Sequence, residues 1–452
     1  MRGLFVLGMG LGLAGAWAAA LRGEKTIDRE RAFQYFPAPE SDPRLVDRLV
    51  RMMTERNRHL VRDNYNLNAR AYSSDSSEEA PPDRRAQIRA ALHVPDALPA
   101  LAVEQYGEVT VAPGIVAERV SYATDYGLRV PAMVYRPAQR PAGKMPGLIV
   151  VNGHGGDKYS WYAFYAGILY ARMGAVVLTY DPIGEGERNA QRKNGTRQHD
   201  KDVEPIDEMG CRMGGLMMTD VMQATSYLEQ RADVDAKRLA AMGYSMGSFV
   251  LGLACAAESR LSACVLTGGG NLDGPGGYWD SSSKRMCQAV PYQAMKFLDD
   301  RGLELYKLHP ATLVWNGSAD TVVAMENGRE FFADMKRRLG AKDFEFGFTE
   351  GGGHRPYFVA RPAAEWLEKH LHFPMWKAEG ETHISEWAAK NQVAMDKQYA
   401  TELSEGGTIA LGTGVPGVAH DLLDALPREK WEAEKEKYVY ETWVREAKAR
   451  GK

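Results

Sequence analysis

Short, continuous apolar runs separated by helix-length segments are the feature that most constrains the fold of this chain. A strand that is apolar on both faces is expected where helices cover both sides of a sheet. The segments between the runs have helical spacing, as in LMMTDVMQATSYLEQRADVD (216–235). The alternation predicts an α/β fold with a mostly parallel central sheet and helices on both faces. The runs are GLIVV (147–151), AVVLTY (175–180), RLAAM (238–242), ACVLT (263–267) and ATLVW (311–315).

The rest of the chain divides around this central pattern. Two alternating runs on either side of the turn Asp125-Tyr126-Gly127 predict a hairpin over 115–137, which would add antiparallel strands at one edge of the sheet. Residues 21–113 are polar and helix-prone, and we expect a helical N-terminal region there. The α/β unit is predicted over 114–374, followed by a C-terminal extension over 375–452 that ends in a charged helix.

The first twenty residues have the pattern of an export signal. Arg2 precedes an apolar run over 4–16, and both Ala16-Trp17-Ala18 and Ala18-Ala19-Ala20 fit a signal-peptidase site. We therefore predict a signal peptide over 1–20 and an exported protein, periplasmic or secreted, with a retained membrane anchor as the alternative. The apolar run is short for a spanning helix, so no stable membrane span is expected after cleavage. The GxGxxG match at 10–15 follows no strand, and we reject it as a dinucleotide site.

Charge and cysteine spacing argue against a nucleic-acid partner and against a zinc site of the paired-cysteine type. The formal net charge is −3, and the basic residues are spread along the chain, which argues against a nucleic-acid partner. The four cysteines, Cys211, Cys255, Cys264 and Cys287, lack the paired CxxC spacing of a zinc site. Their even number in an exported chain permits one or two disulfides.

The pentapeptide GYSMG places Ser245 between an apolar run and a helix-like stretch. A sharp strand-to-helix turn of this kind exposes a serine hydroxyl as a nucleophile, and glycines on either side permit close backbone approach. The alternative is a Gly-rich turn without chemistry. A GxSxG match is not rare by chance in a chain with 46 glycines. The prediction therefore depends on the strand–turn–helix context of the motif.

A serine nucleophile needs a histidine base that is oriented by an acid, in the chain order Ser, acid, His. His354 lies in a Gly-rich loop after the alternating run DFEFGFT, and Asp320 follows the run ATLVW. We predict the triad Ser245, Asp320 and His354; an N-terminal helix cap is the alternative role of Asp320. His370 has helical spacing with Trp366 and is expected to be a packed helix residue. His370 and His372 lack a carboxylate at ligand spacing, so no metal is expected.

The oxyanion of an acyl-transfer reaction needs two N–H donors. One is expected from Met246, at the start of the helix that follows the nucleophile, where the helix dipole favours negative charge. The other is expected from the loop NGHGGDKYS after GLIVV, with Gly156 as the predicted donor and Gly155 as the second choice. A plain turn is the alternative for this loop.

With these residues in place, residues 115–372 resemble an α/β-hydrolase. Within that superfamily the chain is most similar to the acetyl xylan esterase and dienelactone hydrolase-like group. The stretches that carry the resemblance are RVPAMVYRP, NGHGGDKYS, YDPIGEGER, GYSMGS, NGSADTVV and GGGHRPYF. The elbow differs from the Gly-Cys-Ser-Arg pattern of glucuronoyl esterases, and many acetyl xylan esterases have Gln where this chain has Met246.

The resemblance implies a serine esterase that acts on short acyl esters, acetyl esters of carbohydrate first, with no cofactor, and the segment over 1–20 adds export. Long segments over 182–210 and 271–310 interrupt the βα pattern after strand ends, where open α/β sheets bind ligands. Tyr278 and Trp279 in the second segment are predicted to stack on a sugar, and packing within the loop is the alternative. A serine peptidase or amidase of the same fold, and a non-catalytic binding protein, remain alternatives.

Overall fold

The computed structural model describes residues 84–193, 195–270, 272, 287, 290–318, 320, 328–349, 354–376 and 423–451. The predicted signal peptide, Tyr278 and Trp279 lie outside these residues. A nine-stranded sheet crosses the molecule in the order β1-β2-β3-β5-β4-β6-β7-β8-β9. The strands are β1 (Glu104–Ala112), β2 (Ile115–Ala123), β3 (Arg129–Pro137), β4 (Met145–Val151), β5 (Val176–Tyr180), β6 (Val234–Tyr244), β7 (Ala263–Thr267), β8 (Ala311–Gly317) and β9 (Phe344–Thr349).

Strand direction follows the pattern that the sequence predicts. β1, β2 and β3 pair antiparallel, β3 pairs antiparallel with β5, and every pair from β5 to β9 is parallel. Every residue of β4, β5 and β7 is buried, as expected for strands covered on both faces. The predicted fold class, a mostly parallel sheet with flanking helices and a helical C-terminal tail, is confirmed.

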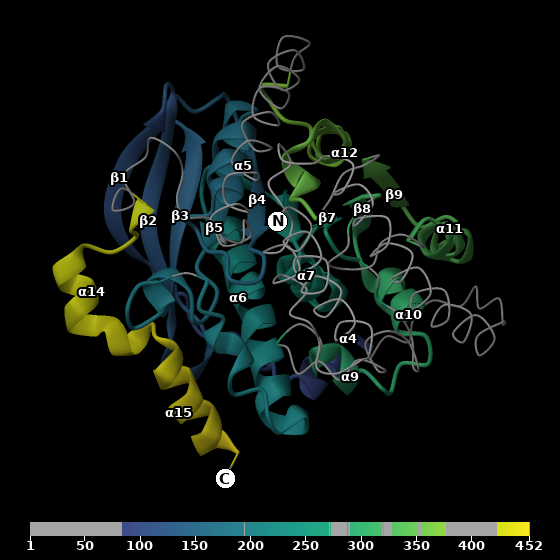
Figure 1. Cartoon of the computed structure of the whole chain (residues 1–452). Coiled ribbons are helices and arrows are strands. Elements are labelled where there is room, and N and C mark those ends of the chain that lie inside the picture. The colour runs from purple at the N-terminus through teal and green to yellow at the C-terminus, as the bar shows by residue number, and fades with distance from the viewer. Residues whose placement is uncertain are drawn as a thin grey trace, which may run out of the picture.

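Helices cover both faces of the sheet, and the buried apolar residues form two main clusters between sheet and helices. One cluster joins the sheet to α6 (Cys211–Glu229), α7 (Met246–Ala257) and α10 (Arg301–Leu308). The other joins it to α5 (Trp161–Arg172) and α12 (Arg361–Leu371). In the view of Figure 1, α12 lies above strands β7 to β9 and α10 lies below them. The remaining helices are α4 (Arg84–Ala91), η1 (Asp125–Gly127), η2 (Gly186–Arg188), η3 (Gln198–Asp200), η4 (Ile206–Gly210), α9 (Val290–Ala294), α11 (Gly328–Leu339), η6 (Tyr357–Val359), α14 (Arg428–Glu434), η9 (Lys435–Lys437) and α15 (Tyr440–Arg450).

β1 lies within the stretch that the sequence assigned to a helical N-terminal region. Its sequence, EQYGEVTVA, is largely polar, and none of its residues is fully buried because the strand forms the edge of the sheet. An edge strand with water on one side lacks the continuous apolar signal of the central strands. The helical expectation is therefore wrong for 104–112.

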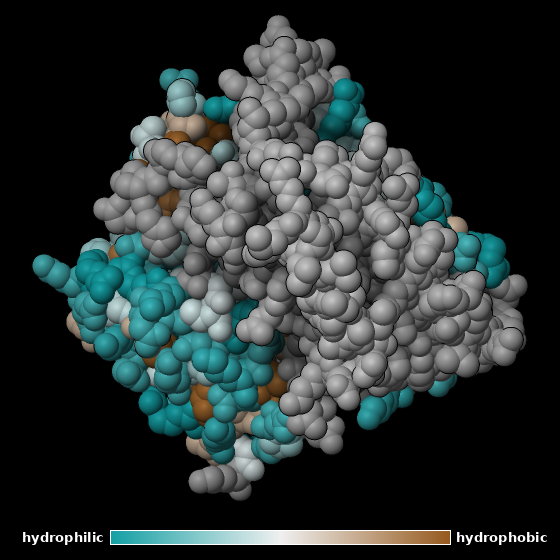
Figure 2. Space-filling model, in the orientation of Figure 1, coloured by the Kyte–Doolittle hydropathy of each residue, from teal (hydrophilic) through white to brown (hydrophobic). Residues whose placement is uncertain are grey.

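The C-terminal extension packs against the sheet edge that carries β1 (Figure 1). Lys430 of α14 forms an ion pair of 2.9 Å with Glu104, and Arg450 of α15 donates two hydrogen bonds to Asp125 at 2.9 and 2.8 Å. A small apolar cluster holds the extension together: Ala425, Leu426, Trp431, Tyr438 and Val439. Figure 2 shows a mainly hydrophilic described surface over the region where Figure 1 places these helices.

None of the described helices is both long and apolar enough to cross a membrane. The four cysteines are buried thiols, and the Sγ atoms of Cys255 and Cys264 lie 3.0 Å apart between α7 and β7.

His309, at the end of α10, is a buried histidine that links stability to pH. Its Nε2–H donates to the carbonyl of Gly252 at 2.7 Å, and the residue is 1% exposed. Burial lowers its pKa to about 3. The hydrogen bond to Gly252 opposes this effect, and the nearby cations Lys342 and Arg85 add to it. Below about pH 6.5 the unfolded chain therefore binds a proton that the folded protein does not bind, and folding stability is lost as the pH falls.

Replacing His309 with Gln removes this titration. We expect the loss of unfolding free energy caused by His309→Gln to be largest at pH 7 and to shrink by about 2 kcal/mol at pH 5, at about 1.4 kcal/mol per pH unit. Urea unfolding of both proteins between pH 7 and pH 5 measures the difference. A difference that stays constant over this range would contradict the buried neutral histidine.

Candidate active site

Ser245 forms the turn between β6 and α7. The strand ends at Tyr244 and the helix begins at Met246, so that Ser245 alone makes the connection. Its backbone angles are φ 54° and ψ −116°, in a region that residues with a side chain rarely occupy. Its N–H donates to the carbonyl of Thr267 at 2.9 Å, which fixes the turn to β7. The strained strand-to-helix turn predicted from GYSMG is present.

The two glycines of the pentapeptide are required by close backbone contacts. A Cβ atom at Gly243 would lie 2.6 Å from the carbonyl oxygen of Gly247. A Cβ atom at Gly247 would lie 2.1 Å from the carbonyl oxygen of Val151 at the end of β4. Both distances are far below van der Waals contact, so the turn can close only with glycine at these positions.

Asp320 and His354 come from loops after β8 and β9 and meet at the same edge of the sheet. His354 Nδ1 lies 2.7 Å from Asp320 Oδ2. The Asp320 side chain is fully buried, and the imidazole is 10% exposed. The carboxylate accepts the Nδ1 hydrogen, which selects the tautomer with a lone pair on Nε2. This is the arrangement that a base oriented by an acid requires.

The imidazole of His354 lies beside the elbow. Its ring centroid is 4.9 Å from that of Tyr244, the residue before the nucleophile. The Tyr244 hydroxyl donates to the carbonyl of His354 at 3.0 Å and so ties the histidine loop to β6. A Cβ atom at Gly268, the residue after Thr267, would lie 2.9 Å from His354 Cε1. Tyr244 is a positioning residue that sequence analysis did not single out.

The two predicted oxyanion donors differ in their surroundings. Met246 is the first residue of α7, where the helix dipole favours a negative charge. The N–H of Gly156 donates to the carbonyl of Gly153 at 2.9 Å, within a turn of the loop after β4. Gly156 is therefore engaged in this turn, and the structure does not present its N–H as a ready donor. Gly155, the second choice, has φ 82°, and its carbonyl accepts the N–H of Gly195 at 3.0 Å.

The predicted polar loop over 182–210 begins with a buried, charge-paired stretch, since residues 182–189 are all buried, whereas exposed positions such as Lys193 come later. Lys158 Nζ lies 2.5 Å from Asp181 and 2.8 Å from Glu187, and all three side chains are fully buried. Arg188 pairs with Asp220 of α6 at 2.5 Å. In this segment, which the sequence placed where open α/β sheets bind ligands, Glu187 and Arg188 are therefore paired with other residues of the protein.

The C-terminal extension completes this buried network. The backbone N–H groups of Ala425 and Leu426 donate to the Glu187 carboxylate at 2.8 and 2.9 Å. The indole of Trp431 donates to the Glu187 carbonyl at 2.8 Å. Ala425 and Leu426, more than 230 positions after Glu187 in the sequence, thus bind the carboxylate that also pairs with Lys158.

The remaining histidine prediction concerns α12. The rings of His370 and Trp366 have centroids 4.4 Å apart, and His370 also lies 3.4 Å from Asp343. His370 is therefore a packed helix residue, as its spacing predicts.

A family model supports the superfamily assignment. The model described as the prolyl oligopeptidase family matches residues 159–380, a little under half of the chain. The match begins after β4, spans the Ser245 elbow and both loops that carry Asp320 and His354, and ends after α12. The chain has the α/β-hydrolase fold. The hairpin and β1 lie before the matched stretch, and α14 and α15 lie after it.

Solved structures similar to this α/β-hydrolase include two acetyl xylan esterases. The first, from Thermoanaerobacterium sp. JW/SL YS485, is 15% identical, covers 68% of this chain and 98% of its own, and has a TM-score of 0.46. The second, from Paenibacillus sp. R4, is 16% identical, with 65% and 96% covered and a TM-score of 0.46. A glucuronoyl esterase from Solibacter usitatus is 14% identical, with 66% and 93% covered and a TM-score of 0.47. No curated protein matches the chain in sequence.

Proposed function

We propose that this α/β-hydrolase is a serine esterase. Ser245 attacks the ester carbonyl while His354 Nε2 takes the hydroxyl proton, and Asp320 holds the imidazole in the required tautomer. The alcohol leaves with that proton, and water then releases the acyl group by the same route in reverse. The observation that carries the proposal is the 2.7 Å pair of Asp320 and His354 beside a strained serine turn.

The oxyanion of the tetrahedral intermediate is assigned to the N–H of Met246 and to a donor from the loop over 153–156. If the Gly153–Gly156 turn stays closed during the reaction, Gly155 supplies the second hydrogen bond; if it opens, Gly156 does. Each such donor stabilises the transition state by roughly 3 to 4 kcal/mol.

Labelling with a fluorophosphonate probe distinguishes a serine hydrolase from a non-catalytic binding protein of the same fold. The probe reacts with a serine oxygen only where a neighbouring base activates it. We expect one adduct per chain, on the peptide that contains Ser245. A folded protein that takes up no probe, or that is labelled at another serine, would overturn the proposal.

The proposed substrate is a short acyl ester, acetyl first, on a carbohydrate alcohol, and the proposed location is outside the cytoplasm. Support comes from the sequence resemblance to acetyl xylan esterases and from the export pattern over 1–20. The insertion over 182–210 gives this substrate less support than its composition suggested, because Glu187 and Arg188 are paired internally.

Chain-length profiling tests the acyl group. With a series of nitrophenyl esters, we expect the highest kcat/KM between acetyl and butyryl, and we expect acetate release from acetylated xylan. Deacetylated xylan serves as the blank for the second assay. Highest activity on decanoyl or longer esters, or no release from any acetylated carbohydrate, would contradict the proposed substrate.

A peptidase or amidase is the second candidate, because the family model that matches residues 159–380 is that of the prolyl oligopeptidases. The same serine, histidine and acid would cleave an amide if the leaving nitrogen were protonated by His354. Turnover of a proline nitroanilide faster than that of the matched ester would favour this candidate over the esterase.

A further inference from the structure

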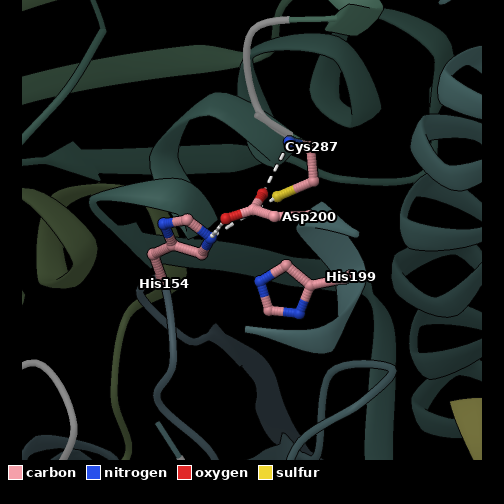
Figure 3. A group of neighbouring side chains, drawn as sticks. All are labelled: His154, His199, Asp200 and Cys287. Atoms are coloured by element: carbon pink, nitrogen blue, oxygen red, sulfur yellow. Dashed lines mark hydrogen bonds and ion pairs between the residues drawn. The ribbon is translucent and has the colours of Figure 1, made fainter. Parts of the chain in front are cut away.

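A cluster of metal-ligating side chains lies next to the nucleophile, outside the triad. It consists of His154, His199, Asp200 and Cys287, whose ligand atoms all lie within 4.8 Å of one another. Figure 3 shows the four side chains converging from the loop after β4, from η3, and from the segment that contains Cys287. Both histidines and Cys287 are buried. The cluster is distinct from the pair His370 and His372 that sequence analysis considered for a metal.

His199 supplies the observation that distinguishes this cluster from an ordinary hydrogen-bonded group. Its Nδ1–H donates to the carbonyl of Ile183 at 3.0 Å, so the lone pair is on Nε2. Nε2 is buried and has no hydrogen-bond partner among the described residues, and the ring is 0% exposed. In Figure 3 this nitrogen points toward His154 and Asp200. Burial, with the neighbouring His154, lowers the pKa of His199 to about 4, which keeps the ring neutral at pH 7.

A buried nitrogen lone pair without a donor destabilises the folded protein. The other ring nitrogen of a metal-bound histidine characteristically donates to a backbone carbonyl, as His199 Nδ1 does to Ile183. The orphaned nitrogen and the oriented ring are therefore explained together by a cation at the centre of the cluster.

The other three side chains complete a four-ligand set. Asp200 Oδ2 lies 2.7 Å from His154 Nε2, and Asp200 Oδ1 accepts the backbone N–H of Cys287 at 2.9 Å. Cys287 Sγ lies 3.9 Å from His154 Nε2. Tetrahedral bonds of the lengths that zinc makes place ligand atoms roughly 3.3 to 3.6 Å apart, so small side-chain rotations would bring these atoms to that spacing.

We propose that His154, His199, Asp200 and Cys287 bind one zinc-type divalent cation. Two imidazole nitrogens, a carboxylate oxygen and a thiolate form a donor set that suits zinc better than magnesium or calcium. On binding, the Cys287 thiol releases its proton to solvent and the His154 hydrogen moves from Nε2 to Nδ1, so that both atoms present lone pairs. The proposal does not depend on the esterase activity.

The location gives the cation a structural task. His154 precedes Gly155 and Gly156 in the loop proposed to hold the oxyanion, and Cys287 Sγ lies 3.5 Å from Met246 Sδ. The cation would therefore tie the glycine loop, the insertion over 182–210 and Cys287 together beside the nucleophile.

Metal binding to the full chain tests the proposal. The protein is treated with a chelator, dialysed and titrated with Zn²⁺ or Co²⁺. We expect about one ion per chain by elemental analysis, and a cobalt–thiolate charge-transfer band in the near ultraviolet, which is independent of any enzymatic assay. A folded wild-type protein that binds neither ion would overturn the site.

Four variants assign the ligands. Cys287→Ser is expected to abolish the cobalt–thiolate band, and His199→Gln to weaken Zn²⁺ affinity by at least tenfold. Cys211→Ser, a buried thiol outside the cluster, and His372→Gln, an exposed histidine, are expected to leave affinity within about twofold. Circular dichroism confirms that each variant is folded. Wild-type affinity in both cluster variants would refute the assignment.

Discussion

Replacement of Ser245 by alanine is expected to lower the turnover of a short ester by roughly 10⁴- to 10⁶-fold while the protein stays folded. The hydroxyl is the proposed nucleophile, and no other described serine occupies a strained turn beside the Asp320–His354 pair. Alanine removes one oxygen from a residue that is 6% exposed, so the change in stability should be small. Initial rates and a thermal unfolding curve on the same preparation measure both effects.

Ser262→Ala is the matched control. Its hydroxyl donates to the carbonyl of Leu239, at the far end of the sheet from the elbow. The same atom is removed there, and kcat should stay within about twofold of the wild-type value. Ester turnover at the wild-type rate in folded Ser245→Ala protein would exclude the proposed mechanism, whatever the result for Ser262→Ala.

The central strands could be predicted because burial on both faces of a sheet requires a continuous apolar sequence. β4, β5 and β7 are buried on both faces, and their residues are apolar without interruption. β1 could not be predicted in the same way. It is an edge strand whose side chains alternate between half-buried and exposed, so its composition resembles that of a surface helix.

The elbow could be predicted because its requirements are local. Ser245 needs an unusual backbone conformation, and Gly243 and Gly247 are demanded by contacts under 3 Å. The pairing of Asp320 with His354 depends on contacts across the sheet, but β8 and β9 are adjacent and parallel. Loops after neighbouring parallel strands meet at the same sheet edge, so chain order was sufficient.

The insertion over 182–210 could not be interpreted correctly because its partners are remote. A stretch rich in Glu, Arg and Asn indicates a solvated loop unless the opposing charges are known. Here Glu187 is paired with Lys158 and bonded to Ala425 and Leu426. No regular spacing in the sequence marks such an arrangement, and the same is true of His154, His199, Asp200 and Cys287.

The buried network leads to the second large expected effect, because Lys158 supplies its cation. Replacing Lys158 with Met keeps the length and apolar stem of the side chain but leaves Asp181 and Glu187 facing each other without the ammonium group. Removing one partner of a fully buried ion pair costs about 3 to 5 kcal/mol of unfolding free energy. We expect Lys158→Met to lower stability by this amount at pH 7, measured by urea unfolding.

The pH dependence of this loss follows from the charges left behind. Burial already raises the pKa of Glu187 despite the opposing effect of Lys158, and removing the cation raises it further. As the pH falls, a Glu187 carboxyl without its cation takes up a proton more readily in the folded variant than in the unfolded chain, which relieves the destabilisation. The difference between wild type and Lys158→Met should therefore be smaller at pH 5 than at pH 7.

The C-terminal extension provides an independent readout, because Glu187 accepts the N–H groups of Ala425 and Leu426 just before α14. When the carboxylate loses its cation, it shifts or becomes protonated, and either change weakens both bonds. Trypsin should then cut the variant after Arg428 or Lys430 faster than the wild type under native conditions. Lys193→Met, the same substitution at an exposed lysine of the insertion over 182–210, should change neither stability nor cleavage. Equal stability and equal cleavage in Lys158→Met and Lys193→Met would mean that the buried pair does not hold the extension to the site, and that its other contacts, such as the Arg450–Asp125 and Lys430–Glu104 pairs, are sufficient.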